Sequence, residues 1–151
     1  MRATERAMGT LVFVARLLAG GLLVGAAALK VGHPEPLAAA IAGFRLLPEF
    51  AIGPIALALP YFELLLGGYL IAGLFTRTAA IVACVQFVLY AGAIASAIVR
   101  HIPALCGCFG PNDSAVADWP HVAFDLALAA VGAFVAWGAP GRWSLDARMR
   151  A

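Results

Sequence analysis

Four long apolar runs dominate the chain, and short polar segments separate them. The runs cover about residues 9–31, 54–75, 78–100 and 120–138, and the last of them is the shortest. Each is close to the roughly 20 residues that a helix needs to cross a bilayer. The runs are continuously apolar, whereas a strand of a membrane barrel alternates polar and apolar positions. The pattern therefore predicts an all-α fold, a polytopic four-helix bundle that lies in the lipid bilayer.

The link between the first two runs is long enough to hold a helix of its own. Its sequence is PEPLAAAIAGFRLLPEF, in which Leu37, Ile41, Phe44 and Phe50 could line one side of an element on the membrane surface, closed by Pro48. We therefore expect a short interfacial helix between the first and second spans. An ordinary connector without a further role is the simpler alternative.

The composition agrees with a membrane protein and excludes a nucleic-acid binder. Of the 151 residues, 64% are hydrophobic and 12% are charged, whereas soluble domains are about half apolar and about a quarter charged. The net charge is only +2, and the Lys and Arg residues stand singly rather than in a basic patch that could neutralise a phosphate backbone. No linker or clear repeat divides the chain, so we treat residues 1–151 as a single transmembrane domain.

The positive charges at the ends of the apolar runs and between them predict an orientation. Lys and Arg collect on the cytoplasmic side of membrane proteins. Six fall on the side that holds both termini, and three fall on the other side. The six are Arg2, Arg6, Arg77, Arg142, Arg148 and Arg150, and the three are Lys30, Arg45 and Arg100. Both termini are therefore predicted to be cytoplasmic, and the loop between the third and fourth runs faces outward, into the periplasm or its equivalent.

That outward loop contains the sequence LCGCFGP, residues 105–111. Two cysteines two residues apart can approach to the roughly 4.4–6.8 Å between α-carbons that a disulfide needs, if the residue between them bends freely as Gly107 does. A disulfide that closes so small a ring constrains few residues, so it adds little stability, and it is reduced easily. The spacing of Cys106 and Cys108 therefore favours redox exchange. Two alternatives stay open. They are Cu(I) binding, with His101 as the nearest further ligand, and an inert pair or passive bridge.

Three charged side chains interrupt the apolar runs, and each costs roughly 2.5–3.5 kcal/mol at the centre of a membrane helix. They are Arg16, Glu63 and Asp125, and they should face the bundle interior. At about 1.5 Å per residue, Arg16 lies about 11 Å from the cytoplasmic end of its run and Glu63 about 14 Å from the outer end of its own. In a core of about 30 Å these depths differ by only about 5 Å, so we predict an ion pair between Arg16 and Glu63.

Asp125 lies about one turn into the fourth run, on the same side of the membrane as the cysteines. Three roles stay open for it. It could hold a proton for thiol exchange, orient His121 at position i−4, or pair with Lys30 at the outer end of the first run.

Small residues predict where the helices touch. Gly21 and Gly25 form a GxxxG pair in the first run, and Gly67 and Gly68 are the small pair of the second. Cys84 stands alone in the middle of the third run and is predicted to pack as a small hydrophobic residue.

Several of these features together resemble the MauE family of methylamine utilisation membrane proteins, which belongs to a wider DoxX-like group. They are an arginine early in the first run, LK at its end, FRLLP in the link, LPYFELLLG in the second run, and CGCFG before a fourth run that opens with W and then D followed by L. CGCFG is the specific element, and the match extends from Arg16 to about Trp137. The resemblance implies a four-helix bacterial inner-membrane protein that supports maturation of the methylamine dehydrogenase small subunit, a periplasmic protein rich in disulfides.

The resemblance also implies residue roles and partners. Cys106 and Cys108 would be the redox pair, and a thioredoxin-like periplasmic protein would be the partner. The implied intramembrane polar set is Arg16, Lys30, Glu63 and Asp125. The chain departs from the family at Phe124, where an arginine often precedes the acidic residue, and this departure bears on how Asp125 is paired.

The function that the sequence favours is thiol and disulfide handling at the outer face of the membrane, in support of a disulfide-containing periplasmic client. A partner thiolate would attack Cys106 or Cys108, and Asp125 or His101 would move the proton. Whether the chain is itself an enzyme, a thiol-disulfide oxidoreductase, stays open. The alternatives are a non-enzymatic DoxX-like scaffold subunit with a passive bridge, and Cu(I) delivery through the CxC pair.

No cofactor and no metal site are evident in the sequence. A quinone site could be lined by Tyr61, Tyr90 and Trp119 in the outer half of the spans. Aromatic residues at that depth are more often interface anchors.

Overall fold

The structure, a computed structural model, describes residues 2–107, 110 and 115–149. Four long helices make up most of this part, namely α1 (Arg2–Lys30), α3 (Glu49–Ala72), α4 (Thr76–Val99) and α5 (Trp119–Gly138). Each is long and apolar enough to cross a membrane. The described residues form no strand beyond an isolated bridge between Leu105 and Val116. The chain is therefore a multi-pass membrane protein, and the all-α four-helix prediction is confirmed.

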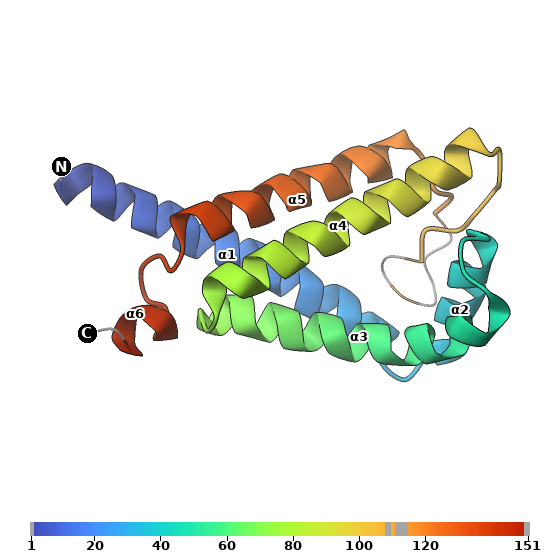
Figure 1. The fold of residues 1–151 in the computed structure, drawn as a ribbon, viewed down its shortest axis with the longest axis horizontal. Helices are drawn as coiled ribbons and strands as arrows, with labels where there is room; N and C mark the ends of the chain where they lie inside the picture. The colour runs from blue at the N-terminus through green and yellow to red at the C-terminus, as the bar shows by residue number, and fades with distance from the viewer. Residues whose placement is uncertain (1, 108–109, 111–114, 150–151) are drawn as a thin grey trace.

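The four long helices run alternately in opposite directions along the bundle (Figure 1). α1 packs against α3 and α5, and α4 packs against α5 and α3. The start of α1, the α3–α4 turn and the short helix α6 (Leu145–Met149) lie at one end, which we call the terminal end. Helix α2 and the described residues between α4 and α5 lie at the opposite end, which we call the loop end.

The predicted short helix between the first two spans is present as α2 (Pro34–Gly43), which packs against α3. Pro34 suits the start of a helix because its missing N–H group would have no partner there. Leu37 is buried, but Phe50 is 82% exposed and belongs to α3, so the predicted apolar row does not extend along one element. The second span begins at Glu49 rather than at about residue 54, directly after Pro48.

Two glycines bring the backbones of α1 and α3 together. A Cβ atom added to Gly67 would lie 2.7 Å from the carbonyl oxygen of Gly20, and one added to Gly20 would lie 2.8 Å from that of Gly67. Either contact is shorter than a real Cβ atom makes. An added Cβ at Gly21 or Gly25 would meet no neighbouring atom within 4 Å. The predicted contact through Gly67 is confirmed. The contacts predicted at Gly68 and at the GxxxG pair Gly21 and Gly25 are wrong, because Gly20 makes the close contact on α1.

Gly67→Ala is expected to lower the free energy of unfolding by about 1–3 kcal/mol, because the new methyl group would force α1 and α3 apart at a packed contact. Gly68 is the matched control, since a Cβ atom there meets nothing within 4 Å. Gly68→Ala should cost nothing, or stabilise the helix through the higher propensity of alanine. Unfolding titrations with SDS in mixed micelles measure both, and equal losses for the two variants would contradict the close helix contact.

Candidate functional site

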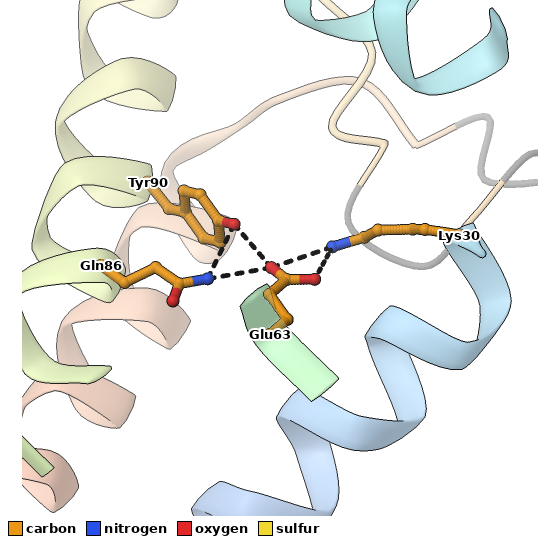
Figure 2. Close-up of polar contacts among 4 residues, drawn as sticks. All are labelled: Lys30, Glu63, Gln86 and Tyr90. Carbon is orange, nitrogen blue, oxygen red and sulfur yellow. Dashed lines mark hydrogen bonds and ion pairs between the residues drawn. The ribbon is translucent and has the colours of Figure 1, made fainter. Parts of the chain in front are cut away.

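Glu63 lies at the centre of a buried polar cluster (Figure 2). Its side chain is 1% exposed and that of Lys30 is 5% exposed. Lys30 Nζ, at the end of α1, donates hydrogen bonds to Glu63 Oε2 at 2.9 Å and to Oε1 at 3.2 Å. From α4, Gln86 Nε2 donates to Oε1 at 3.0 Å, and the Tyr90 hydroxyl donates to the same oxygen. These four residues, the Glu63 cluster, join three helices and give the buried carboxylate its counter-ion.

The predicted ion pair between Arg16 and Glu63 is wrong, and the packing of α1 on α3 explains why. Because these helices run in opposite directions, the Gly20–Gly67 contact places Glu63 level with about residue 24 of α1. Arg16 lies about 12 Å along α1 from that level and Lys30 about 9 Å, at about 1.5 Å per residue. Side chains of a helix lean towards its N-terminus. Lys30 therefore leans towards Glu63, and Arg16 leans away from it.

Arg16 instead holds the segment that follows α5. Its side chain is completely buried. Nη1 donates to the carbonyl oxygen of Pro140 at 3.2 Å, and Nη2 donates to that of Trp143 at 3.2 Å. In the same segment, the carboxylate of Asp146 accepts hydrogen bonds from backbone N–H groups at the start of α4. Arg16 thus belongs to the terminal end and does not join the other intramembrane charges.

Asp125, in the first half of α5, lies beside the Glu63 cluster at a small cavity. The cavity has a volume of about 50 Å³, which is enough for at least one water molecule. Lys30, Glu63, Tyr90 and His121 line it together with Asp125. Asp125 is 6% exposed, and its Oδ2 atom has no hydrogen-bond partner among the described residues. A buried carboxyl oxygen is costly without a partner, so this atom needs a proton donor or a water molecule in the cavity.

The two residues predicted as partners of Asp125, Lys30 and His121, make their hydrogen bonds with other residues. Lys30 donates to Glu63, and the ring of His121 contacts Asp118, whose carboxylate also caps α5 by accepting from the His121 backbone N–H. Those bonds with His121 hold the pKa of Asp118 below its usual range. Neither Lys30 nor His121 is hydrogen-bonded to Asp125 in the described part of the chain, although both line the same small cavity as Asp125.

Cys106 is disulfide-bonded, and Cys108 lies outside the described residues. The side chain of Cys106 is 8% exposed and belongs to an apolar cluster that includes Ile94 of α4 and Val122 of α5. Its backbone N–H donates to the carbonyl oxygen of Ala115 at 2.8 Å. The cysteine is therefore fixed against both helices at the loop end.

Gly107 allows the backbone next to Cys106 to approach α2. Its φ angle is +62°, in the region that favours glycine. A Cβ atom at this position would lie 2.8 Å from Cβ of Ala40.

His101, predicted as a proton carrier or a copper ligand, is exposed in the turn after α4. In the described ranges, no group of three or more His, Cys, Asp or Glu side chains is placed to hold a metal ion.

Comparison with known proteins decides the family. The family described as "Methylamine utilisation protein MauE" matches residues 8–138. The chain belongs to the MauE family.

Three MauE relatives show how far the likeness extends, and each is named "Methylamine utilization protein MauE". The chain is 30% identical over 126 residues to the protein of Paracoccus denitrificans, covering 83% of this chain and 68% of that protein. It is 34% identical over 120 residues to the protein of Methylorubrum extorquens, covering 79% and 64%. It is 33% identical over 131 residues to the protein of Methylophilus methylotrophus, covering 84% and 68%. This MauE chain thus matches roughly two thirds of each relative's length, and no solved structure matches it.

The resemblance described above leads us to expect an arginine before Asp125, and the structure shows where Phe124 lies instead. Phe124 is 45% exposed and lines the small cavity next to Asp125. It contributes an apolar wall where an arginine would bring a cation. Among the described residues that line the cavity, the Lys or Arg side chain is therefore that of Lys30.

The sequence reasoning missed two members of the MauE chain's polar cluster. Gln86 is a polar side chain in an otherwise uncharged span, and Tyr90 follows four residues later on the same face of the helix. That spacing could have indicated that the two side chains share a polar contact inside the bundle. From the sequence, Tyr90 was instead assigned to a quinone site or to an interface anchor. Cys84 is a free cysteine that packs against the core cluster of the bundle, as predicted.

Proposed function

We propose that this MauE-family chain handles thiols and disulfides at the outer face of the bacterial inner membrane. Cys106 and Cys108 are the redox pair, a thioredoxin-like periplasmic protein is the partner, and a disulfide-containing periplasmic protein is the client. The relatives carry the name methylamine utilization protein. Extended to this chain, that name and the family resemblance make the small subunit of methylamine dehydrogenase the first client to test.

The observation that carries the proposal is the disulfide at Cys106. Cys106 packs with Ile94 of α4 and Val122 of α5, away from the segment that Arg16 holds. Disulfides persist in oxidising compartments such as the periplasm. An outward loop end also agrees with the distribution of Lys and Arg, which favours cytoplasmic termini.

The exchange reaction balances without further reactants. A client thiolate attacks one sulfur of the bridge between Cys106 and Cys108, forms a mixed disulfide and releases the other cysteine as a thiolate. The second client thiolate then attacks the client sulfur of the mixed disulfide. The client leaves oxidised and the cysteine pair is left reduced. Two electrons move from the client to the pair, and the two protons of the client thiols end on the two cysteines.

Asp125 is the group that we assign to moving these protons. It follows Val122 by three residues and so shares a face of α5 with it, and Val122 packs in the same cluster as Cys106. The unpartnered Oδ2 atom lies in the wall of a cavity that can hold water. A proton could therefore pass between the carboxyl group and the cysteines through water.

Asp125→Asn is expected to slow exchange with a model dithiol about 100-fold, the order of a lost general acid or base. The reduction potential of the cysteine pair should stay unchanged, because the amide alters the proton path and not the sulfur atoms. Asp125→Glu should restore part of the rate. Stopped-flow thiol exchange measures the rate, and an unchanged rate in the Asn variant would remove Asp125 from the mechanism.

The experiment that tests the proposed function is the redox state of the pair in intact cells. Free thiols are alkylated with a mass tag in a Cys84→Ser background, so that only Cys106 and Cys108 are counted. We expect a mixture of oxidised and reduced chains that shifts towards the reduced form when the client is overproduced. A bond that stays fully oxidised under every condition would instead support a passive bridge in a scaffold subunit.

A further inference from the structure

A second and larger cavity lies at the loop end, between α2, α3, α4 and the residues Cys106 and Gly107. Its volume is about 380 Å³, within the roughly 300–1,000 Å³ of small-molecule sites. Most of the wall is apolar, with side chains such as Leu59 of α3 and Ala93 of α4. Cys106 lines the cavity, and so do the polar side chains Lys30 and Tyr90. One cavity thus joins the disulfide-bonded Cys106 to two members of the Glu63 cluster.

The hydrogen bonds of these two side chains define what the cavity can hold. The Tyr90 hydroxyl donates its hydrogen to Glu63. Lys30 has three N–H donors and directs hydrogen bonds to the two oxygens of Glu63, so a third N–H is left for an acceptor. A matching occupant is apolar over most of its surface and presents an acceptor oxygen near Lys30.

The cysteine content of the chain calls for an external electron acceptor. The sequence has three cysteines, of which Cys106 is in a disulfide and Cys84 is free. Once a client has reduced the pair at Cys106, the chain therefore has no second pair of thiols to take the electrons onward. An oxidant must therefore reach the pair, and the large apolar cavity between α2, α3 and α4 extends to Cys106.

We propose that the large cavity binds a membrane quinone that reoxidises the cysteine pair containing Cys106. A quinone is soluble in the bilayer, fills an apolar cavity with its ring and tail, and presents carbonyl oxygens to Lys30. A phospholipid tail would match the apolar wall but cannot accept electrons. This inference rests on the proposed function, and it adds the acceptor that returns the pair to its oxidised form.

The reoxidation step balances in electrons and protons. The two thiols lose two electrons and two protons, and the bond that forms is the S–S bond. The quinone gains the two electrons and two protons, so that its two carbonyl groups become the hydroxyl groups of the quinol. Lys30 also lines the small cavity that contains Asp125. The ammonium group can therefore hold the carbonyl oxygen on one side while Asp125 and water supply the proton path on the other.

The test uses the full chain in nanodiscs, reduced with a dithiol that is then removed, with decylubiquinone added under anaerobic conditions. Quinol formation is followed by absorbance and remaining thiols are counted by mass tagging. We expect one quinol for each disulfide formed. Ala93→Phe fills the cavity and should slow the reaction about tenfold or more, equivalent to about 1.4 kcal/mol of lost binding. The matched control is Ala127→Phe on an exposed position of α5, which should react like the parent chain.

A second variant guards against misfolding of Ala93→Phe. Leu46 lines the cavity from the segment between α2 and α3 and is 49% exposed. Leu46→Trp should therefore fill space without entering a helix contact, and it should slow quinone reduction to a similar extent. Both variants should keep the parent rate of exchange with small thiols, because their cysteines are untouched.

The outcomes separate this inference from the proposed function. If the disulfide exchanges with small thiols but decylubiquinone neither oxidises the reduced pair nor binds, the quinone site is wrong and the proposed function stands. Phospholipid retained in the cavity against added quinone would overturn the inference in the same way. If the bond exchanges with no thiol at all, the proposed function fails and the quinone step fails with it.

Discussion

Glu63→Leu is expected to destabilise the bundle by about 3–5 kcal/mol, the cost of leaving one partner of a buried ion pair without the other. Lys30 is 5% exposed and its described hydrogen bonds go to Glu63. Removing the carboxylate therefore leaves a buried ammonium group with no counter-ion in the cluster. Gln86 and Tyr90 lose the same acceptor, although Gln86 Nε2 still donates to the Tyr90 hydroxyl at 2.9 Å.

The double variant Lys30→Met with Glu63→Leu is the matched control. Replacing both members of a buried pair with apolar residues of similar size is often neutral or even stabilising, so most of the lost stability should return. Unfolding titrations of the three proteins in mixed micelles give the comparison. A double variant as unstable as Glu63→Leu would show that the ion pair is not what holds these helices.

Cys106→Ser and Cys108→Ser are expected to reduce client disulfide formation in the cell to the background level. A single remaining thiol can still enter a mixed disulfide, but it has no neighbour with which to form or receive the bridge. The amount of chain in the membrane should stay the same, because insertion depends on the four apolar spans. Mass tagging of the client counts the disulfides that are missing.

Cys84→Ser is the matched control for those two variants, because it is the same substitution in the free cysteine of α4. It should leave client disulfides unchanged. The strongest contrary result would be normal client disulfides in a strain that carries serine at both Cys106 and Cys108. In that case the loop cysteines have no part in client oxidation.

The sequence predicted the membrane helices well because their signal is continuous and local. Each span is an apolar run of the required length, and α2 follows a proline-marked start in the link. The segment after α5 gave no such signal. Its role depends on carbonyl oxygens that accept hydrogen bonds from Arg16, which is more than 120 residues away in the chain. No pattern along the sequence reports a contact of that kind.

The charged residues of the candidate site were predicted, but the pairing and the two uncharged members, Gln86 and Tyr90, were not. Lys30, Glu63 and Asp125 were identified as intramembrane charges, and the structure places all three at one small cavity. The predicted pairing of Arg16 with Glu63 was wrong because the sequence gives only the depth of each residue from the ends of its own helix. The depth of Glu63 relative to α1 is set by the Gly20–Gly67 contact, and the lean of each side chain decides which cation reaches it.

The reduction potential of the Cys106 disulfide is the measurement that decides whether this chain exchanges disulfides. The purified chain in nanodiscs, in the Cys84→Ser background, is equilibrated with defined thiol buffers, and the reduced fraction is measured by mass tagging. The proposed function predicts a reversible transition at roughly −120 to −270 mV, the range of exchange proteins. A bond that resists reduction below about −300 mV, as structural disulfides do, would contradict it.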